Sequence, residues 1–433
     1  MNTKLEFHGS DIEKVCEHYG LKKEDIVNFG ANVNPLGLSE QVKKALAAHL
    51  DLLSSYPDRS YTSLRNILST YCQIPAEFIL PGNGSSELIS LLIQERAPKH
   101  TLILGPTYSE YSRELSFSGS TQEYYHLQEE RNFSLDVDDL CKTLEKGYDF
   151  LIICNPNNPT SSAIMQEDLR RLIAFCSGKN IFVMIDETYV EFAPDINAVT
   201  AVPLTREFTN LMVLRGVSKF YAAPGMRLGY GITGNRKFLA KMREKQTPWS
   251  LNSLGAFAGE KMLLDHDYFR RTRDLILGER DRMETELKKL PIFKVYPAYA
   301  NFILLKIQKE GLTSADVFEA CIDGTLDQID LQFADNACVC IVLASNGYPV
   351  SYEKGFPIRG LETFKEHEGY YCFHAGTKFK DGEIVTNGGR VLGVTALGDT
   401  LKEARANAYK AVDWVDFDNK YYRHDIGKAI DEA

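Results

Sequence analysis

Short apolar runs alternate with longer amphipathic stretches through the middle of this chain. Four of the runs have the length of buried strands, and they span residues 101–105, 150–154, 181–185 and 211–214. The alternation predicts an α/β fold, in which a mostly parallel sheet carries helices on both faces. Ligands of such sheets bind beyond the carboxyl ends of the strands. The residues that follow each run are therefore the first candidates for a functional site.

Composition narrows the class of protein. A chain of 433 residues exceeds one hydrophobic core, so about two or three domains are expected. Hydrophobic residues make up 44% and charged residues 25%, as in globular proteins, and the net charge of -10 disfavours nucleic acid as a partner. No run approaches the roughly 20 apolar residues of a membrane span. The nine cysteines are scattered, mostly in apolar runs, which indicates free thiols in a cytoplasmic protein.

A lysine lies at the break that follows the last run. Ser218 and Lys219 occupy a turn, Arg227 follows in a Gly/Pro-containing segment, and a second apolar run begins after it. A lysine at a strand end, with a hydroxyl beside it and a cation nearby, suits Schiff-base chemistry next to a bound anion. A Ser-Lys pair alone also occurs in ordinary surface loops, so its meaning depends on the other strand ends.

Two upstream segments add an anion site and a ring. Gly84, Ser85 and Ser86 open a helix-like stretch, where free backbone N–H groups and the helix dipole favour a bound anion. Many helices begin in this way, so this feature is weak evidence by itself. Tyr108 follows the run 101–105 and is suited to stack on a planar ligand, although a tyrosine of the core would look the same.

The two central runs end in polar residues. Asn158 lies in a Pro/Asn-rich turn that would point its amide at a ligand. Asp186 ends the following run, where a buried carboxylate is costly unless it is paired, and Tyr189 comes one turn later. A protonated heterocyclic nitrogen would supply the missing partner of Asp186.

Taken in this order, the strand ends resemble those of the class I/II aminotransferase family, whose members are fold-type I enzymes dependent on pyridoxal 5'-phosphate. The resemblance covers residues 1 to about 320. The pair His8-Gly9 and the segments 31–37 and 219–225 look most like threonine-phosphate decarboxylases, which are close relatives of histidinol-phosphate aminotransferases. The resemblance implies a homodimer and a phosphorylated amino acid or amine as substrate, with no metal.

The resemblance also assigns roles. Lys219 would form the Schiff base with the cofactor and shuttle protons, Asp186 would keep the pyridine nitrogen protonated, and Tyr189 would complete the catalytic set. Tyr56 would reach the cofactor phosphate of the neighbouring subunit. The implied cofactor-binding residues are Tyr56, Gly84, Ser85, Ser86, Tyr108, Asn158, Asp186, Tyr189, Ser218, Lys219 and Arg227. The implied substrate-binding residues are His8, Gly9, Asn32 and Asn158.

The chain departs from this family at several places. Ser161 stands where glycine is usual, and Gly216 stands where a small or hydroxyl residue is common. After residue 322 the family pattern ends, before the arginine-bearing segment that would bind the substrate carboxylate and phosphate.

From about residue 323 the chain resembles the C-terminal part of phosphoribosylamine–glycine ligase, an ATP-grasp enzyme of purine synthesis. The matching runs include 342–349, 374–377, 387–399 and 422–427. The resemblance implies an α+β ligase-like domain with a final helix near 401–415. The nucleotide-binding domains and metal-binding carboxylates of such a ligase would lie upstream, and the chain lacks them.

Four parts are therefore expected along the chain. Residues 1–40 form an N-terminal arm and part of a small domain, 41–265 the cofactor-binding large domain, 266–322 a linker helix and a truncated small domain, and 323–433 the ligase-like domain. The two resemblances meet without a Gly/Ser- or Pro-rich linker. Natural fusions join whole domains at exposed linkers, so this junction indicates a chimera.

The first functional hypothesis is decarboxylation of O-phospho-L-threonine to aminopropanol phosphate, a step of cobalamin biosynthesis. The second is an aminotransferase that acts on histidinol phosphate or a similar amine. A third hypothesis is a chimera that binds pyridoxal phosphate with little activity, because the carboxylate-binding arginines are missing. A fourth is a fragment of a purine-pathway glycine ligase.

Overall fold

The computed structural model of the chain describes residues 12–26, 30–308, 313–314, 317–318, 321, 337–348, 350–380 and 382–427. These residues form two compact units, one that ends at Cys321 and one that begins at Ala337. The junction expected at residues 322–323 lies outside the described residues, as do His8 and Gly9. Within the described chain, no helix has both the length and the apolar composition to cross a membrane.

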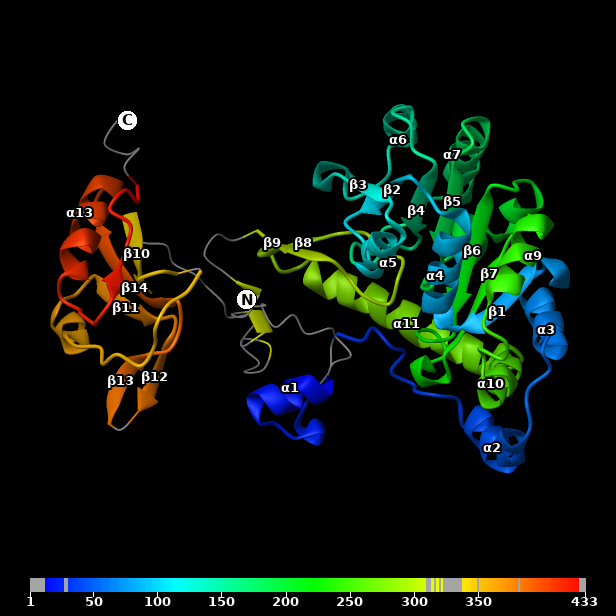
Figure 1. Ribbon diagram of the computed structural model, residues 1–433, viewed down its shortest axis with the longest axis horizontal. Helices are drawn as coiled ribbons and strands as arrows, with labels where there is room; N and C mark the ends of the chain where they lie inside the picture. The colour runs from blue at the N-terminus through cyan, green and yellow to red at the C-terminus, as the bar shows by residue number, and fades with distance from the viewer. Residues whose placement is uncertain are drawn as a thin grey trace. The chain divides into compact units, whose positions relative to one another are not determined.

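The first unit is built on a seven-stranded sheet with the strand order β1-β7-β6-β5-β4-β2-β3 (Figure 1). Only β7 runs antiparallel to its neighbours, and the remaining pairs are parallel, so the predicted α/β class is confirmed. The strands are β1 (Ile79–Asn83), β2 (His100–Gly105), β3 (Thr121–His126), β4 (Phe150–Cys154), β5 (Phe182–Asp186), β6 (Leu211–Gly216) and β7 (Leu228–Ile232).

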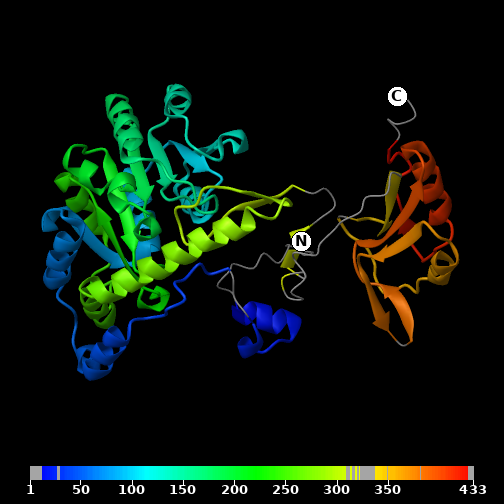
Figure 2. The ribbon, with the colours of Figure 1, turned by 180° about the vertical axis from the view of Figure 1, so that it is seen from behind.

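Alternate residues of the central strands feed two separate cores. On β5, Val183 and Ile185 pack into one core, while Phe182 and Met184 pack into the other. Figures 1 and 2 show helices on both sides of the sheet. One core uses α3 (Thr62–Cys72), α6 (Val137–Leu144), α7 (Gln166–Gly178), α10 (Ser253–Leu263) and α11 (His266–Leu287), and the other uses α4 (Gly84–Arg96), α5 (Glu110–Ser118) and α9 (Arg236–Lys245).

The carboxyl ends of the central strands are aligned. Cys154 of β4 pairs with Asp186 of β5, which pairs in turn with Leu214 of β6. Because parallel strands in this register end at one edge of the sheet, the loops that follow them meet above that edge.

A buried ion pair fixes the backbone just after β5. The guanidinium of Arg215 donates from Nε and Nη2 to Glu187 Oε2 at 2.9 and 2.7 Å, and the Thr200 hydroxyl donates to the same carboxylate oxygen at 2.8 Å. Such a pair is tolerated in a core only when hydrogen bonds satisfy both charges, as they do here. Glu187 is thereby anchored between Asp186 and the turn that carries Tyr189.

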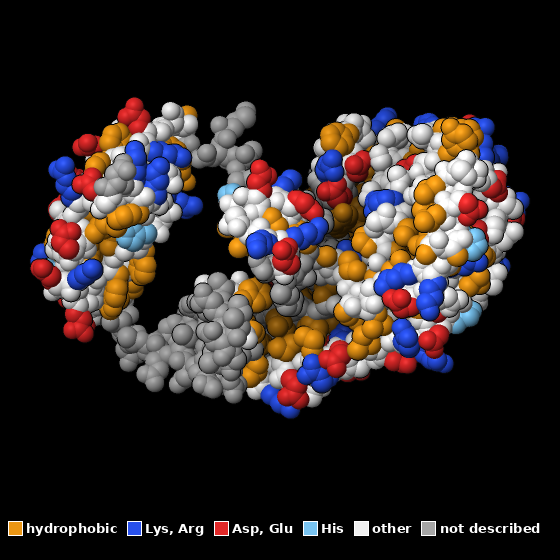
Figure 3. Space-filling model, turned by 90° about the horizontal axis from the view of Figure 1, so that it is seen from below, with side chains coloured by type: hydrophobic (Ala, Val, Ile, Leu, Met, Phe, Trp, Pro, Cys, Tyr) orange, Lys and Arg blue, Asp and Glu red, His pale blue; other side chains and the backbone are white. Residues whose placement is uncertain are grey.

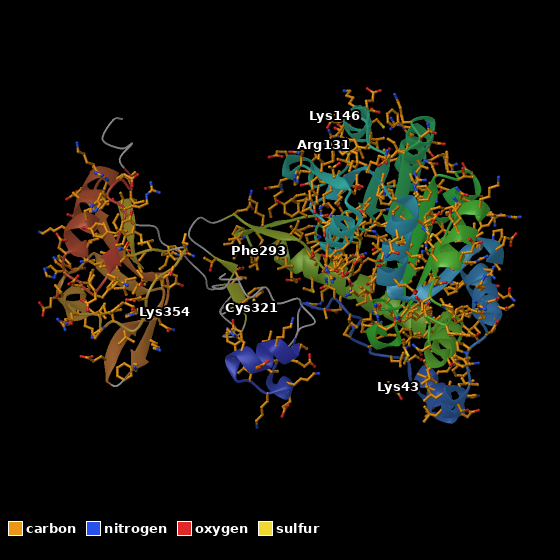
Figure 4. The ribbon with its side chains drawn as sticks, viewed as in Figure 1. Lys43, Arg131, Lys146, Phe293, Cys321 and Lys354 are labelled. Atoms are coloured by element: carbon orange, nitrogen blue, oxygen red, sulfur yellow. The ribbon has the colours of Figure 1, made fainter. Side chains whose placement is uncertain are left out.

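Other elements of this unit are α1 (Ile12–Tyr19), α2 (Glu40–Ala48), α8 (Ile196–Val199) and the antiparallel hairpin of β8 (Phe293–Val295) and β9 (Leu305–Ile307). Phe293, labelled in Figure 4, opens the hairpin that follows the long helix α11.

Two local features adjoin the elements of the first unit. Helix α2 ends at Ala48, because His49 leaves the helical region at φ -131°, and a 3-10 turn, η2 (Leu50–Ser54), follows. Residues 80–83 lie in β1, directly before the start of α4. Pro81 is tolerated in this strand because β1 lies at the edge of the sheet.

The second unit has a four-stranded sheet in the order β11-β14-β10-β15, a hairpin of β12 and β13, and one long helix, α13 (Leu401–Val412). The α13 residues Ala404, Ala408 and Ala411 pack into the core of this unit. Its strands are β10 (Ala337–Ser345), β11 (Tyr370–His374), β12 (Thr377–Lys380), β13 (Glu383–Thr386), β14 (Arg390–Gly398) and β15 (Lys420–Tyr421). Acidic and basic side chains are interspersed on the visible face of each unit (Figure 3).

Candidate functional site

A cavity of about 260 Å³ lies above the aligned carboxyl ends of β4, β5 and β6. Most of the site residues predicted from the sequence line it. They are Asn32, Ser85, Ser86, Tyr108, Asn158, Asp186, Tyr189, Ser218, Lys219 and Arg227. Residues that lie far apart in the sequence therefore converge on one pocket of the first unit.

Lys219 lies in the turn between β6 and β7. Its Nζ donates a hydrogen bond to the carbonyl oxygen of Ala31 at 2.6 Å, and its own carbonyl accepts from the N–H of Asn34 at 3.1 Å. Burial of the ammonium group lowers the pKa of Lys219. At a given pH, a larger fraction of the molecules therefore carries Lys219 as the neutral amine, which is the form that attacks an aldehyde.

Asp186 ends β5 and is buried at the floor of the cavity. The Tyr111 hydroxyl donates to Oδ2 at 2.8 Å, while the backbone N–H and the hydroxyl of Thr188 donate to Oδ1 at 2.9 and 2.5 Å. Burial raises the pKa of Asp186, and these three donors partly offset the shift. No basic side chain of the described residues forms an ion pair with this carboxylate.

The opposite end of the cavity is suited to an anion. Helix α4 begins at Gly84, so the backbone N–H groups of its first turn and the hydroxyls of Ser85 and Ser86 lie at a helix N-terminus. Gly84 has φ +80°, and a Cβ atom added there would lie 2.4 Å from Nη2 of Arg227. Only glycine allows the guanidinium to approach the start of α4 this closely.

Aromatic side chains form the walls. The rings of Tyr108 and Tyr111 meet edge to face with their centroids 5.6 Å apart. Tyr189 is only 4% exposed, and its burial raises the pKa of its hydroxyl, whereas a hydrogen bond with the Asn32 side chain acts in the opposite direction. Asn158 lies half-buried on the cavity wall.

Some predicted residues lie elsewhere. Gly84 supports Arg227 without lining the cavity. Tyr56 is 79% exposed, its ring lies tilted against that of Trp249 with the centroids 4.7 Å apart, and it does not line the cavity of its own chain. His8 and Gly9 are outside the described residues, so their role in substrate binding stays a prediction.

The sequence reading missed Tyr111 and Thr188, which bind Asp186. Tyr111 lies in the first turn of α5, three residues after Tyr108, and this closeness in the chain was the available signal. Thr188 lies two residues after Asp186, the spacing at which an aspartate commonly accepts a bond from the local backbone.

Comparisons with known proteins divide the chain into the same two parts. Residues 24–325 match the family model described as aminotransferase class I and II, and residues 338–429 match the model described as phosphoribosylglycinamide synthetase, C domain. The threonine-phosphate decarboxylase of Salmonella typhimurium is 35% identical over 305 residues, which cover 70% of this chain and 83% of that protein.

Solved structures are similar to a large part of the chain. The crystal structure of the histidinol-phosphate aminotransferase from Clostridium acetobutylicum is 30% identical, with a TM-score of 0.62, and covers 68% of this chain and 86% of that one. The histidinol-phosphate aminotransferase of Sinorhizobium meliloti in complex with pyridoxal-5'-phosphate has a TM-score of 0.62 at 20% identity, over 75% of this chain and 85% of that one. This second likeness concerns the fold alone.

The matched aminotransferase family depends on pyridoxal 5'-phosphate, and the cavity fits this cofactor. The buried carboxylate of Asp186 has no cationic partner in the part of the chain that the structure describes, and a protonated pyridine nitrogen would supply one. The cradle of α4 and Arg227 suits the phosphate group, and Lys219 supplies the amine that takes up the aldehyde.

We predict that Gly84→Ala weakens binding of pyridoxal phosphate by about 10-fold or more, the equivalent of roughly 1.4 kcal/mol. The added methyl group would displace the Arg227 guanidinium and disfavour the positive φ of residue 84. Equilibrium titration of the cofactor measures the effect. Gly225→Ala is the matched control, because no heavy atom lies within 4 Å of its added Cβ. Equal affinities of the two variants would contradict the proposed cradle.

We also predict that the rate of cofactor capture rises with pH and levels off with a midpoint below 10.5, the ordinary pKa of lysine. Below its lowered pKa Lys219 is an unreactive ammonium, and above it the amine is neutral. Stopped-flow absorbance measures the rate. The reference is Nα-acetyl-lysine in the same buffers, because its side-chain amine is free. A midpoint equal to that of the free amine would show that burial does not tune Lys219.

The long family match, the 35% identical relative and the convergence of Lys219, Asp186 and Arg227 on one cavity agree with one another. The C-terminal unit carries a separate match to a ligase C domain. The chain belongs to the class I and II aminotransferase family of pyridoxal-phosphate-dependent enzymes.

Proposed function

We propose that this chain decarboxylates O-phospho-L-threonine to aminopropanol phosphate. The observation that carries the proposal is the cavity, in which Lys219, a buried Asp186 and an anion cradle lie together. The 35% identical relative is a threonine-phosphate decarboxylase, which favours this reaction over others of the family.

Each residue of the cavity then has a defined task. Lys219 holds the cofactor and moves protons at the reacting carbon of the substrate. Asp186 keeps the pyridine nitrogen protonated, and the bonds from Tyr111 and Thr188 orient that carboxylate and favour its ionised form. When bound, pyridoxal phosphate accepts the electron pair that is released as a bond to the substrate α-carbon breaks.

The remaining residues bind and orient. Ser85, Ser86, Ser218 and Arg227 would hold the cofactor phosphate, and Tyr108 would cover one face of the ring. Tyr189 and Asn158 would donate hydrogen bonds to the ring oxygen, and Asn32 would contact the substrate.

An aminotransferase acting on histidinol phosphate is the second candidate. The structure from Clostridium acetobutylicum, which has 30% identity to this chain, is a histidinol-phosphate aminotransferase and favours this reading. The two reactions share the cofactor site and differ in which bond of the substrate breaks. An aminotransferase also needs a 2-oxoacid as amino acceptor, so the two can be separated by experiment.

We predict a visible absorbance band when the purified full chain takes up pyridoxal phosphate, and its loss in Lys219→Ala. Addition of O-phospho-L-threonine should release carbon dioxide without any 2-oxoacid. Consumption of histidinol phosphate only in the presence of 2-oxoglutarate would favour the aminotransferase instead. A normal band with no turnover of either substrate would contradict both and leave a chain that binds the cofactor without the reaction.

We further propose that the chain is a cytoplasmic homodimer in which Tyr56 reaches the cofactor phosphate of the partner. Leu50, Leu53 and Tyr56 are highly exposed on and beside η2, as expected of a surface that a second subunit covers. All nine cysteines are free thiols, which suits a reducing compartment.

We predict a dimer mass in sedimentation equilibrium and a lower cofactor affinity for Tyr56→Phe. A monomer with full cofactor affinity would contradict this arrangement.

A further inference from the structure

Three loops that surround the cavity are tied to one short segment between β8 and β9. We call this segment, residues 299–301, the strut. It contacts the loop after β4 that carries Asn158, the turn after β5 that carries Tyr189, and the N-terminal segment that carries Asn32. None of the strut residues lines the cavity itself.

Ser161 holds the first loop. Its hydroxyl oxygen accepts hydrogen bonds from the backbone N–H groups of Tyr299 and Ala300 at 3.2 and 2.9 Å, and its carbonyl accepts from Tyr299 N–H at 2.8 Å. Ser161 is fully buried and has φ +58°, a conformation that favours glycine. The serine keeps this conformation despite its Cβ, and its hydroxyl provides an acceptor that glycine lacks.

Arg280 of α11 holds the second loop. Its buried Nη1 donates to the carbonyl oxygen of Ala300 at 2.9 Å and to that of Phe192 at 3.0 Å. Phe192 belongs to η5 (Val190–Phe192), the turn directly after Tyr189. The ring of Phe302, next to the strut, also meets the ring of Tyr189 edge to face, with centroids 5.3 Å apart.

Asn301 holds the third segment. Its Nδ2 donates to the carbonyl oxygen of Asn32 at 3.0 Å. Asn32 has φ +50°, a sparsely populated conformation that needs such support, and it lines the cavity together with Tyr189. The Oδ1 of Asn301 is buried and has no partner among the described residues, a state that is costly. The bond from Nδ2 to Asn32 is therefore the interaction that accounts for a buried asparagine at position 301.

We propose that Ser161 and Asn301 are positioning residues of the cofactor site, which act through the strut to hold Asn32 against the Tyr189 hydroxyl. This inference rests on the proposed pyridoxal-phosphate site. Loss of either residue frees the Asn32 peptide to leave its left-handed conformation and removes the partner of Tyr189. Tyr189 then donates a weaker hydrogen bond to the ring oxygen of the cofactor, and Asn32 no longer presents its side chain to the substrate.

The pH midpoint of the visible cofactor band reports this change without substrate. A weaker bond from Tyr189 leaves the ring oxygen more negative, so the neighbouring proton of the cofactor–lysine adduct is retained to higher pH. The charged and titratable groups that share the cavity with Tyr189 are Asp186, Tyr108, Cys154, Lys219 and Arg227. Of these, Lys219 bonds to the carbonyl oxygen of Ala31, next to Asn32. A shift of the midpoint therefore reports a change in the segment that carries Ala31 and Asn32.

The test compares Ser161→Gly, Ser161→Ala and Asn301→Ala in the full chain loaded with pyridoxal phosphate. We expect the midpoint to rise by about 0.7 pH unit in each variant, the size of one lost hydrogen bond. KM should rise about 10-fold with a smaller change in kcat, because Asn32 contacts the substrate. Cofactor affinity should stay within about twofold, because Arg227 and the start of α4, which hold the phosphate, are unchanged.

Two further comparisons separate positioning from folding. Ser161→Gly relieves the backbone strain and Ser161→Ala keeps it, so a shift common to both arises from the lost hydroxyl. Ser162→Ala is the matched control, because its hydroxyl bonds to Thr160 and not to the strut. An unchanged midpoint and KM in both Ser161→Gly and Asn301→Ala would overturn the inference.

The result also distinguishes this inference from the proposed reaction. A normal band in the unmodified chain without turnover defeats the reaction alone, and the midpoints still decide the role of the strut. No band in the unmodified chain overturns both.

Discussion

The central constraint of this structure is a buried carboxylate that has no cationic partner among the described residues. The carboxylate of Asp186 receives three hydrogen bonds there, all from the neutral residues Tyr111 and Thr188. Such groups make an ionised carboxylate tolerable in a core, but they do not neutralise it, and burial still raises its pKa. A protonated ring nitrogen would complete the arrangement. The other residues of the cavity would place the cofactor so that its ring nitrogen meets the carboxylate of Asp186.

The sheet provides the geometry for that placement. The register of β4, β5 and β6 brings Cys154, Asp186 and Leu214 to one level, so the loops that follow have a common floor. The buried pair of Arg215 and Glu187 then fixes the backbone directly after Asp186. The site therefore combines a rigid floor with walls made of loops, and the strut ties those loops to one another.

Much of this arrangement could be predicted from the sequence, because strand ends are local features. The order of Tyr108, Asn158, Asp186 and Lys219 along the chain places each at the end of a recognisable apolar run. The interactions across the fold could not be predicted in this way. The approach of Arg227 to Gly84 and the bonds of Ser161 to residues 299 and 300 depend on backbone positions that only the folded chain sets. The departure at Ser161 was visible in the sequence, but its partner was not.

For the second unit, the sequence predicts the kind of domain but not its role in the protein. Its glycine-rich motifs were sufficient to identify a ligase-like C domain, and the match over residues 338–429 confirms the resemblance. Those motifs account for the fold and the separate core of this unit. They do not indicate a contribution to the reaction. The hypothesis of a chimera therefore stays a prediction about the junction.

The most direct test of the account is chemical trapping of the cofactor. The full chain is incubated with pyridoxal phosphate, reduced with borohydride and digested, and the peptides are identified by mass spectrometry. The account predicts one modified peptide, with the adduct on Lys219, and no adduct on exposed lysines such as Lys237. Modification spread over surface lysines, with an unmodified Lys219, would contradict the assignment of this cavity as the cofactor site.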